Sequence, residues 1–266
     1  MALADYGRGK LLSPIDLENY GTARMIRGSC NAPREVVAYV RIPWGTDSHQ
    51  VPVELLPEEI AEVYERLGLR LADSSSSRSL IVTETIEDAA SRFILQMPGL
   101  AASVASLTRV IHVLVSSHDD YDTSHSDPAL PFSVFISVPF SRRADAPLRV
   151  AESLIHETMH LQLSLLERLV PLIDPTLPSV KTYSPWRGTY REAGGILHAL
   201  YVFRVIEQFW AVIARNNLDT LSTRFAASRR AQIEVEIKEI ADFQHSPSLT
   251  HAGRSLVSHL LKGVVP

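Results

Sequence analysis

The residues best suited to chemistry lie in one short run, His156-Glu157-Thr158-Met159-His160. Two histidines four positions apart lie one turn apart on the same face of a helix, so both imidazoles can reach one ion about 2.1 Å away. Residues 151–163 contain no helix breaker. The run therefore predicts a metal-binding helix; the alternative is two hydrogen-bonded histidines on a half-buried helix.

A catalytic metal site needs a third protein ligand beside the two histidines. Glu157 points to a neighbouring helix face, close to the ion but usually not bound to it. The His-x-x-Gly-x-x-His extension that follows some HExxH motifs is absent, because residue 166 is Leu. The downstream segment 184–198 offers two candidates, Glu192 and His198.

A helical wheel of this downstream segment places several functional side chain types together. If the helix is continuous, Arg187, Arg191, Gly195 and His198 fall within about 80° of one another, whereas Glu192 lies roughly 120° from His198. Arginines on an otherwise apolar helix are costly unless they meet an anion. This face predicts an anion site beside the metal; the alternative for each arginine is a pair with a surface carboxylate.

Hydrophobic periodicity predicts an α+β protein, predominantly α-helical, with a small sheet from the N-terminal half. Residues 1–34 show weak periodicity. The expected strands are 35–44, 49–55, 80–85 and 132–139, and the expected helices are 57–69, 86–116 with a break at 97–99, 148–170, 189–216, 219–243 and 250–262.

The polar run 73–79 is the best place for a boundary between parts of the chain, and 118–128 is expected to be a polar loop. We therefore expect a segment 1–75, a strand–helix unit of unknown role packed on the main domain. Residues 76–266 form the expected HExxH metal-binding catalytic domain.

Composition excludes several other classes of protein. The net charge of −4 over 266 residues gives no overall attraction to nucleic acid or an anionic membrane. No run reaches the roughly 18 apolar residues that span a bilayer, and the N-terminus lacks the apolar run of a signal peptide. The single Cys30 cannot form an internal disulfide. These features favour a cytoplasmic protein; they do not indicate an oligomeric state.

The order of four segments is similar to that of a known family. Residues 128–139, 151–167, 184–203 and 249–261 together resemble the HExxH-motif domain found beside or fused to radical-SAM peptide-modifying enzymes, whose members are described as 2-oxoglutarate-dependent peptide β-hydroxylases. The resemblance covers roughly residues 80–262.

The family pattern has a Ser/Ala-Pro-Trp-Arg run, a second Arg four residues later, a Gly-Gly pair and a Leu-His. These features fall on Pro185, Trp186, Arg187, Arg191, Gly194, Gly195 and His198. The residue after the second Arg is commonly Pro in the family but is Glu192 here, a departure that favours His198 over Glu192 as the third ligand.

The resemblance implies an Fe(II) site of His156, His160 and His198, with 2-oxoglutarate and dioxygen as co-substrates. Arg187 and Arg191 are then the candidates that bind the distal carboxylate of 2-oxoglutarate. The implied reaction is hydroxylation of an unactivated carbon, the β-carbon by resemblance, of a peptide or amino acid in natural product biosynthesis. Glu157 would hold a ligand histidine or a water in the pocket.

Two other functions remain open at this point. A zinc peptidase would use Glu157 as the general base and Glu192 as the third ligand, which is what HExxH alone favours. The other function is a non-catalytic domain that binds a peptide or a partner enzyme, which would need neither a general base nor a third metal ligand.

Overall fold

The computed structural model describes residues 35–44, 47–116, 122–128, 130–177 and 180–263. The protein is mostly helical (57%) with a small mixed sheet of five strands in its N-terminal half, which confirms the expected class. Contacts divide the chain into two compact units, one ending at Leu161 and the other beginning at Gln162. Residue 75, the expected boundary, lies inside the N-terminal unit, and the expectations for residues 1–34 and Cys30 lie outside the described residues.

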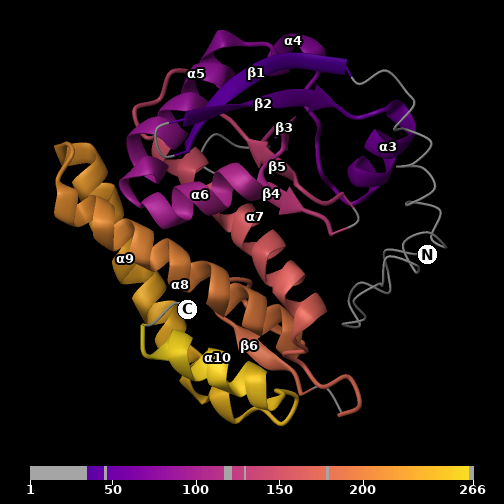
Figure 1. Ribbon diagram of the computed structural model, residues 1–266, viewed down its shortest axis with the longest axis vertical. Coiled ribbons are helices and arrows are strands. Elements are labelled where there is room, and N and C mark those ends of the chain that lie inside the picture. The colour runs from indigo at the N-terminus through magenta and orange to yellow at the C-terminus, as the bar shows by residue number, and fades with distance from the viewer. Residues whose placement is uncertain (1–34, 45–46, 117–121, 129, 178–179, 264–266) are drawn as a thin grey trace. The chain divides into compact units, whose positions relative to one another are not determined.

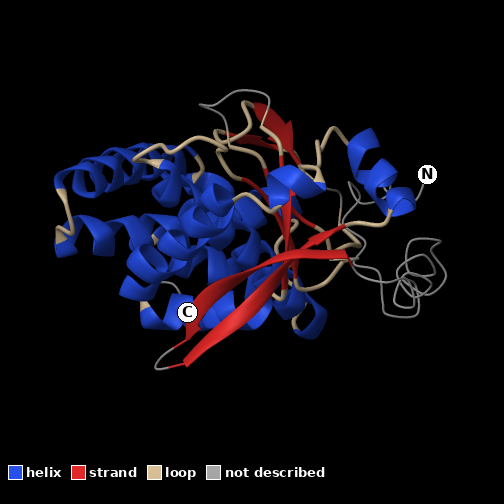
Figure 2. Cartoon of the chain, turned by 90° about the horizontal axis from the view of Figure 1, so that it is seen from above, coloured by secondary structure: helices blue, strands red, loops and turns tan. Residues whose placement is uncertain are grey.

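The sheet of the N-terminal unit has the strand order β1-β2-β3-β5-β4 (Figures 1 and 2). β2 and β3 run parallel, as do β3 and β5, whereas the two outer pairs are antiparallel. The strands are β1 (Glu35–Trp44), β2 (Asp47–Leu55), β3 (Val110–Leu114), β4 (Ser124–Ser126) and β5 (Ser133–Ser137).

β1 and β2 form the long hairpin that the alternating sequence predicts (Figure 2). Their inward residues Val40, Ile42, Val51 and Val53 are buried, as expected of a strand pair with one face on a core. The β1 strand contacts α5 (Leu80–Asp88), the π-helical turn η2 (Ala89–Phe93) and α6 (Pro98–Leu107). The two strands expected at 35–44 and 49–55 are therefore confirmed.

The register of the central strands assigns side chains to two faces of the sheet. His112 pairs with Phe135 on one face, where Tyr64 of α3 (Glu58–Arg66) packs against Phe135. Neighbouring residues of β3 and β5 point to the opposite face, since side chains alternate along a strand. The predicted helix 57–69 and strand 132–139 are confirmed by α3 and β5.

Two predictions in the middle of the unit are wrong. The run Leu80–Thr85 is not a strand but the start of α5, because its buried residues Val82, Thr85 and Ile86 recur at helical spacing. The helix expected to continue to residue 116 ends at Leu107, and residues 110–114 form the central strand β3. The expected break is confirmed, since η3 (Ile94–Gln96) ends just before Pro98 begins α6.

The polar run 73–79, the best place for a boundary in the sequence, contains a short helix. Asp73 caps the one-turn helix α4 (Ser74–Ser77), its carboxylate accepting a hydrogen bond from the backbone N–H of Ser76 at 2.7 Å.

The helix α7 (Ala146–Leu169) carries the HExxH run and confirms the helix expected at 148–170. Its only proline, Pro147, lies in the first turn, where a missing N–H is tolerated. No glycine interrupts it, and Ala151, Leu154, Ile155 and Met159 are buried. This burial accounts for one uninterrupted helix around the two histidines.

The C-terminal unit is built on α8 (Ala193–Asn216), which packs against α9 (Thr220–Glu239) and α10 (His251–Leu261). Glu207 of α8 is buried, and it accepts hydrogen bonds from Arg204 at 3.3 Å and from Arg230 of α9 at 2.7 Å. Thr250 caps α10 by accepting from the N–H of Gly253. The unit also contains η4 (Ala241–His245).

The start of the second long helix differs from its prediction. Residues 189–191 are not helical but form β7 (Thr189–Arg191), which pairs with β6 (Thr182–Ser184) in a hairpin. Gly188 has a φ of +62°, a left-handed conformation that suits glycine and closes this hairpin. The continuous helix assumed for the wheel of Arg187 to His198 is therefore wrong, and only its part from Ala193 onward is helical.

Within the described chain, α8 is the one helix long and apolar enough to cross a membrane. Of its apolar window, 72% is buried inside the protein. This burial is typical of the core helix of a globular unit.

Burial of His112 should make the stability of the N-terminal unit depend on pH. Its Nδ1–H donates to the carbonyl oxygen of Glu54 at 2.8 Å, and burial lowers its pKa from 6.5 to about 4. Between pH 6.5 and pH 4, His112 is protonated in the unfolded chain but stays neutral in the folded chain. The free energy of unfolding is therefore highest above pH 6.5 and falls on acidification towards pH 4.

We expect this one group to cost roughly 2 kcal/mol of unfolding free energy between pH 7 and pH 5. Urea unfolding at both pH values should show a smaller loss for His112→Gln than for the wild type. Equal losses in the two proteins would contradict the prediction.

Candidate metal centre and anion site

His156 and His160 converge on one face of α7. Their Nε2 atoms lie 3.1 Å apart, and the ring centroids are 4.8 Å apart. Two nitrogens bound to one ion at about 2.1 Å would be separated by about 3.0 Å at a right angle and about 3.4 Å at the tetrahedral angle. In this structure the two rings are hydrogen-bonded to each other, and the same separation also matches the spacing of two ligands of a single metal ion. The His156 side chain is 22% exposed, so an ion could reach it from solvent.

Glu157 lies beside this pair but is turned into the protein, where its side chain is 4% exposed. The hydroxyl of Ser124 donates to Oε1 at 2.6 Å, and the hydroxyl of Ser126 donates to Oε2 at 2.6 Å. Both carboxylate oxygens are thus engaged by the edge strand β4. The glutamate is held in one orientation, with Oε1 3.9 Å from the Nε2 of His156.

The segment that carries these serines is itself fixed to α7 and to the sheet. Asp122 accepts a hydrogen bond at 2.8 Å from Nε of Arg149, a buried residue in the first turns of α7. The N–H of Thr123 donates to the hydroxyl of Ser137 in β5 at 2.9 Å. The sequence predicted a polar loop here; residues 124–126 are instead a strand, and its serines were not singled out. The alternation Ser-His-Ser was the only signal for them.

The two candidates for the third ligand lie in the C-terminal unit. The Nε2 of His198 lies 2.8 Å from Oε2 of Glu167, near the C-terminal end of α7, and the His198 side chain is 21% exposed. Glu192 precedes α8; its Oε1 is 3.9 Å from Nζ of Lys181, and its buried Oε2 has no hydrogen-bond partner within the described part of the chain. Among the described residues, no three His, Cys, Asp or Glu side chains form a group that could hold a metal ion. The third ligand stays a prediction.

The two arginines lie in the β6–β7 hairpin rather than on α8. Arg191 packs its guanidinium over Gly195, where an added Cβ would lie 3.1 Å from both Cζ and Nε. Arg191 therefore approaches this glycine closely. Partial burial, followed by repulsion from Arg187, lowers the pKa of Arg191. In the described chain, neither guanidinium pairs with a carboxylate.

Unsatisfied polar groups accompany the arginines in this hairpin. The hydroxyl of Ser184, which is fully buried, and the indole Nε1 of Trp186 have no hydrogen-bond partner among the residues that the structure describes. The first turn of α8 has no side-chain cap, so its N–H groups present the positive end of the helix dipole. Arg187 and Arg191 are both exposed, and two positive charges beside a helix N-terminus can attract an anion. The hairpin and the start of α8 therefore have the charge and the donors of an anion site.

The aromatic residues near this hairpin pack on one another. Trp186 stacks on Phe203 with centroids 5.0 Å apart and planes 7° apart, and the guanidinium of Arg229 lies 5.6 Å from the Phe203 centroid. Tyr190 is 69% exposed and contacts Tyr183. Stacking of Trp186 on Phe203 fixes the indole next to Arg187 in the chain.

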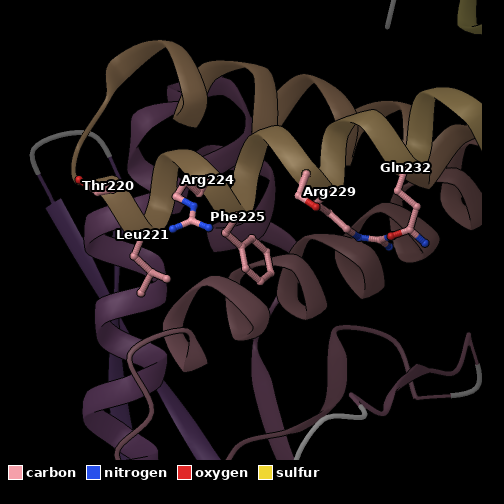
Figure 3. A pocket seen from close by; sticks show the side chains of 7 residues that line it. Thr220, Leu221, Arg224, Phe225, Arg229 and Gln232 are labelled. Carbon is pink, nitrogen blue, oxygen red and sulfur yellow. The ribbon is translucent and has the colours of Figure 1, made fainter.

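A separate groove of about 840 Å³ runs along α9. Figure 3 shows Arg224, Phe225, Arg229 and Gln232 along its wall. No acidic residue or histidine lines it, and neither do the residues that the sequence singled out. It therefore lacks a general base and a metal ligand, and the chemistry is better sought at the HExxH pair.

Comparison with known proteins adds no further assignment. No family model matches the chain, and no curated protein sequence matches it.

The spacing of the histidine pair predicts that one divalent ion binds there. Titration of the protein with Co(II) under anaerobic conditions should show saturable binding, and His156→Ala or His160→Ala should weaken it at least 100-fold, because each removes one of the few ligands. The control is His259→Ala, an exposed histidine of α10 whose Nδ1 bonds within its own helix. Equal binding by all four proteins would rule out the pair as a metal site.

Proposed function

We propose that the protein is an Fe(II)- and 2-oxoglutarate-dependent oxygenase that hydroxylates an unactivated carbon, the β-carbon by family resemblance, of a peptide or amino acid. The observation that carries this proposal is the 3.1 Å spacing of the His156 and His160 Nε2 atoms. Imidazole nitrogens are suitable ligands for Fe(II), and two of them with one further protein ligand leave coordination positions for a co-substrate.

The anion site of the C-terminal unit supports the co-substrate assignment. 2-Oxoglutarate carries two carboxylates, and a guanidinium is the side chain best matched to a carboxylate because it donates two parallel hydrogen bonds. Arg187 and Arg191 have no carboxylate partner in the described chain, and the uncapped start of α8 follows them. A bound dicarboxylate would offset the repulsion between these two arginines.

The roles of the chain's own residues follow from these contacts. His156, His160 and, by resemblance, His198 would hold the ion; one arginine would bind the distal carboxylate. When bound, Fe(II) supplies dioxygen activation, coupling the conversion of 2-oxoglutarate to succinate and carbon dioxide with insertion of one oxygen atom into a C–H bond. Trp186 and Phe203 would form an apolar wall near the arginines.

The zinc peptidase is the second candidate, and one observation favours it: in the described structure the buried Oε2 of Glu192 has no hydrogen-bond partner, so it could bind an ion. A peptidase also needs Glu157 to accept a proton from water and pass it on. The two serine hydroxyls hold both of its oxygens, so it is not available to turn between a water and a leaving group. This arrangement supports the oxygenase over the peptidase.

Succinate release tests the proposal directly. The protein reconstituted with Fe(II) should form succinate from 2-oxoglutarate only in the presence of dioxygen, and His156→Ala should abolish this activity. Succinate formation uncoupled from a prime substrate is slow, so a peptide library supplied as substrate should raise the rate. Hydrolysis of peptides by the zinc-loaded protein, without succinate formation, would instead identify a peptidase.

The arginine variants test the co-substrate site. We expect Arg187→Ala or Arg191→Ala to raise the KM for 2-oxoglutarate by about 10- to 100-fold, the effect of losing hydrogen bonds to a charged group. The control is Arg224→Ala, an arginine of α9 in the groove described above. A KM unchanged in both hairpin variants would remove the co-substrate from this site.

The close contact at Gly195 gives a more sensitive test of the same site. In Gly195→Ala the new methyl group displaces the flexible end of Arg191, so we expect thermal stability equal to or slightly above wild type, since alanine favours a helix, and a KM for 2-oxoglutarate raised several-fold. Gly194→Ala is the matched control, because its Cβ would meet nothing within 4 Å. Equal KM values in the two variants would exclude a role for the Arg191 position.

A further inference from the structure

We infer that Ser124 and Ser126 are positioning residues of the metal centre: they hold Glu157 as a fixed negative charge beside the metal-binding histidines and keep it from becoming a ligand itself. This inference rests on the proposed function, because it assumes a metal ion at His156 and His160. It assigns a role to the edge strand β4, which the HExxH motif does not include.

The geometry of β4 suits this role. Side chains alternate along a strand, so Ser124 and Ser126 point to the same face of the sheet, and each hydroxyl reaches one oxygen of Glu157 at 2.6 Å. His125, between them, points to the opposite face, where its ring centroid lies 5.9 Å from those of Tyr64 and Phe135. The aromatic contacts of His125 thus hold β4 in place, and the serines of this strand bind the carboxylate.

The two serine hydrogen bonds stabilise the buried negative charge of Glu157. A carboxylate removed from water needs strong hydrogen bonds to remain there, and two short bonds from hydroxyls supply them. Oε1 of Glu157 lies 3.9 Å from Nε2 of His156, the atom that would bind the ion. A negative charge at this distance stabilises a cation on that nitrogen.

Without the hydroxyls, the carboxylate has two alternatives. It can rotate towards solvent, which removes its charge from the vicinity of the ion, or it can rotate onto the ion as an additional ligand, which changes the coordination shell. Both alternatives leave the histidines in place. The serines therefore should affect the affinity and the ligand field of the metal rather than the presence of the site.

The experiment uses the full chain with Co(II) as the probe, which reports affinity by titration and coordination by its visible spectrum. We expect the double variant Ser124→Ala/Ser126→Ala to bind Co(II) about 10-fold more weakly, or with a changed visible spectrum, since the loss of residues that orient metal ligands typically costs 10- to 100-fold in affinity. The conservative variant Ser124→Thr/Ser126→Thr keeps both hydroxyls and should restore wild-type binding.

The matched control is Ser103→Ala in α6, whose hydroxyl donates only to the carbonyl oxygen of Gly99 in its own helix. If the double alanine variant does not fold, Ser124→Ala and Ser126→Ala alone carry the test, because each keeps one hydrogen bond; each should weaken Co(II) binding at least 3-fold. Wild-type affinity together with a wild-type spectrum in the folded alanine variants overturns the inference.

Failure of this inference and failure of the proposed function give different results. A wild-type protein that binds no Co(II) overturns both. A wild-type protein whose Co(II) binding is lost in His156→Ala but unchanged in the serine variants overturns only the positioning role of β4.

Discussion

The buried carboxylate of Glu157 is the constraint on which the organisation of the N-terminal unit depends. A carboxylate with almost no solvent contact is unfavourable by several kcal/mol unless donors surround it. The hydroxyls of Ser124 and Ser126 each donate to one of its oxygens, so β4, at the edge of the sheet, lies with these hydroxyls facing α7. The position of the edge strand and the orientation of the HExxH helix are thereby coupled through one charge.

A second charged contact keeps this coupling in register. Arg149 lies two turns before His156 on α7 and binds Asp122, two residues before Ser124. Two charged contacts separated along both segments prevent α7 from rotating or sliding relative to β4. Helix geometry alone places His156 and His160 one turn apart on the same face of α7. The three residues of β4 fix the orientation of Glu157 beside them.

The sequence predicted those parts of the fold in which local pattern and burial agree. The alternation of β1 and the unbroken run of α7 gave correct elements, and the HExxH spacing gave the converging pair. The strand predicted at 80–85 is wrong because β-branched residues are typical of strands, whereas the buried residues of this segment recur with a helical period. The helix predicted over residues 189–191 is wrong because the helical periodicity was extended through a hairpin that Gly188 closes. Ser124 and Ser126 could not be found, since their role depends on a tertiary contact with a residue about 30 positions away.

The HExxH motif occurs with two chemistries, and the contacts of the glutamate are a physical reason for preferring the one proposed above. A general base must exchange a proton with a water that sits on the metal, so at least one of its oxygens must face that water in a changeable hydrogen-bond arrangement. A glutamate that accepts hydrogen bonds from two hydroxyls meets a different requirement, which is a permanent negative charge at a fixed distance from a cation. In a reaction that transfers no proton through Glu157, the fixed position of this residue is no disadvantage, and its charge increases the affinity of the site for the ion. The arginines of the C-terminal unit fit the proposed oxygenase, because a guanidinium binds the carboxylate of a dicarboxylate co-substrate through two parallel hydrogen bonds.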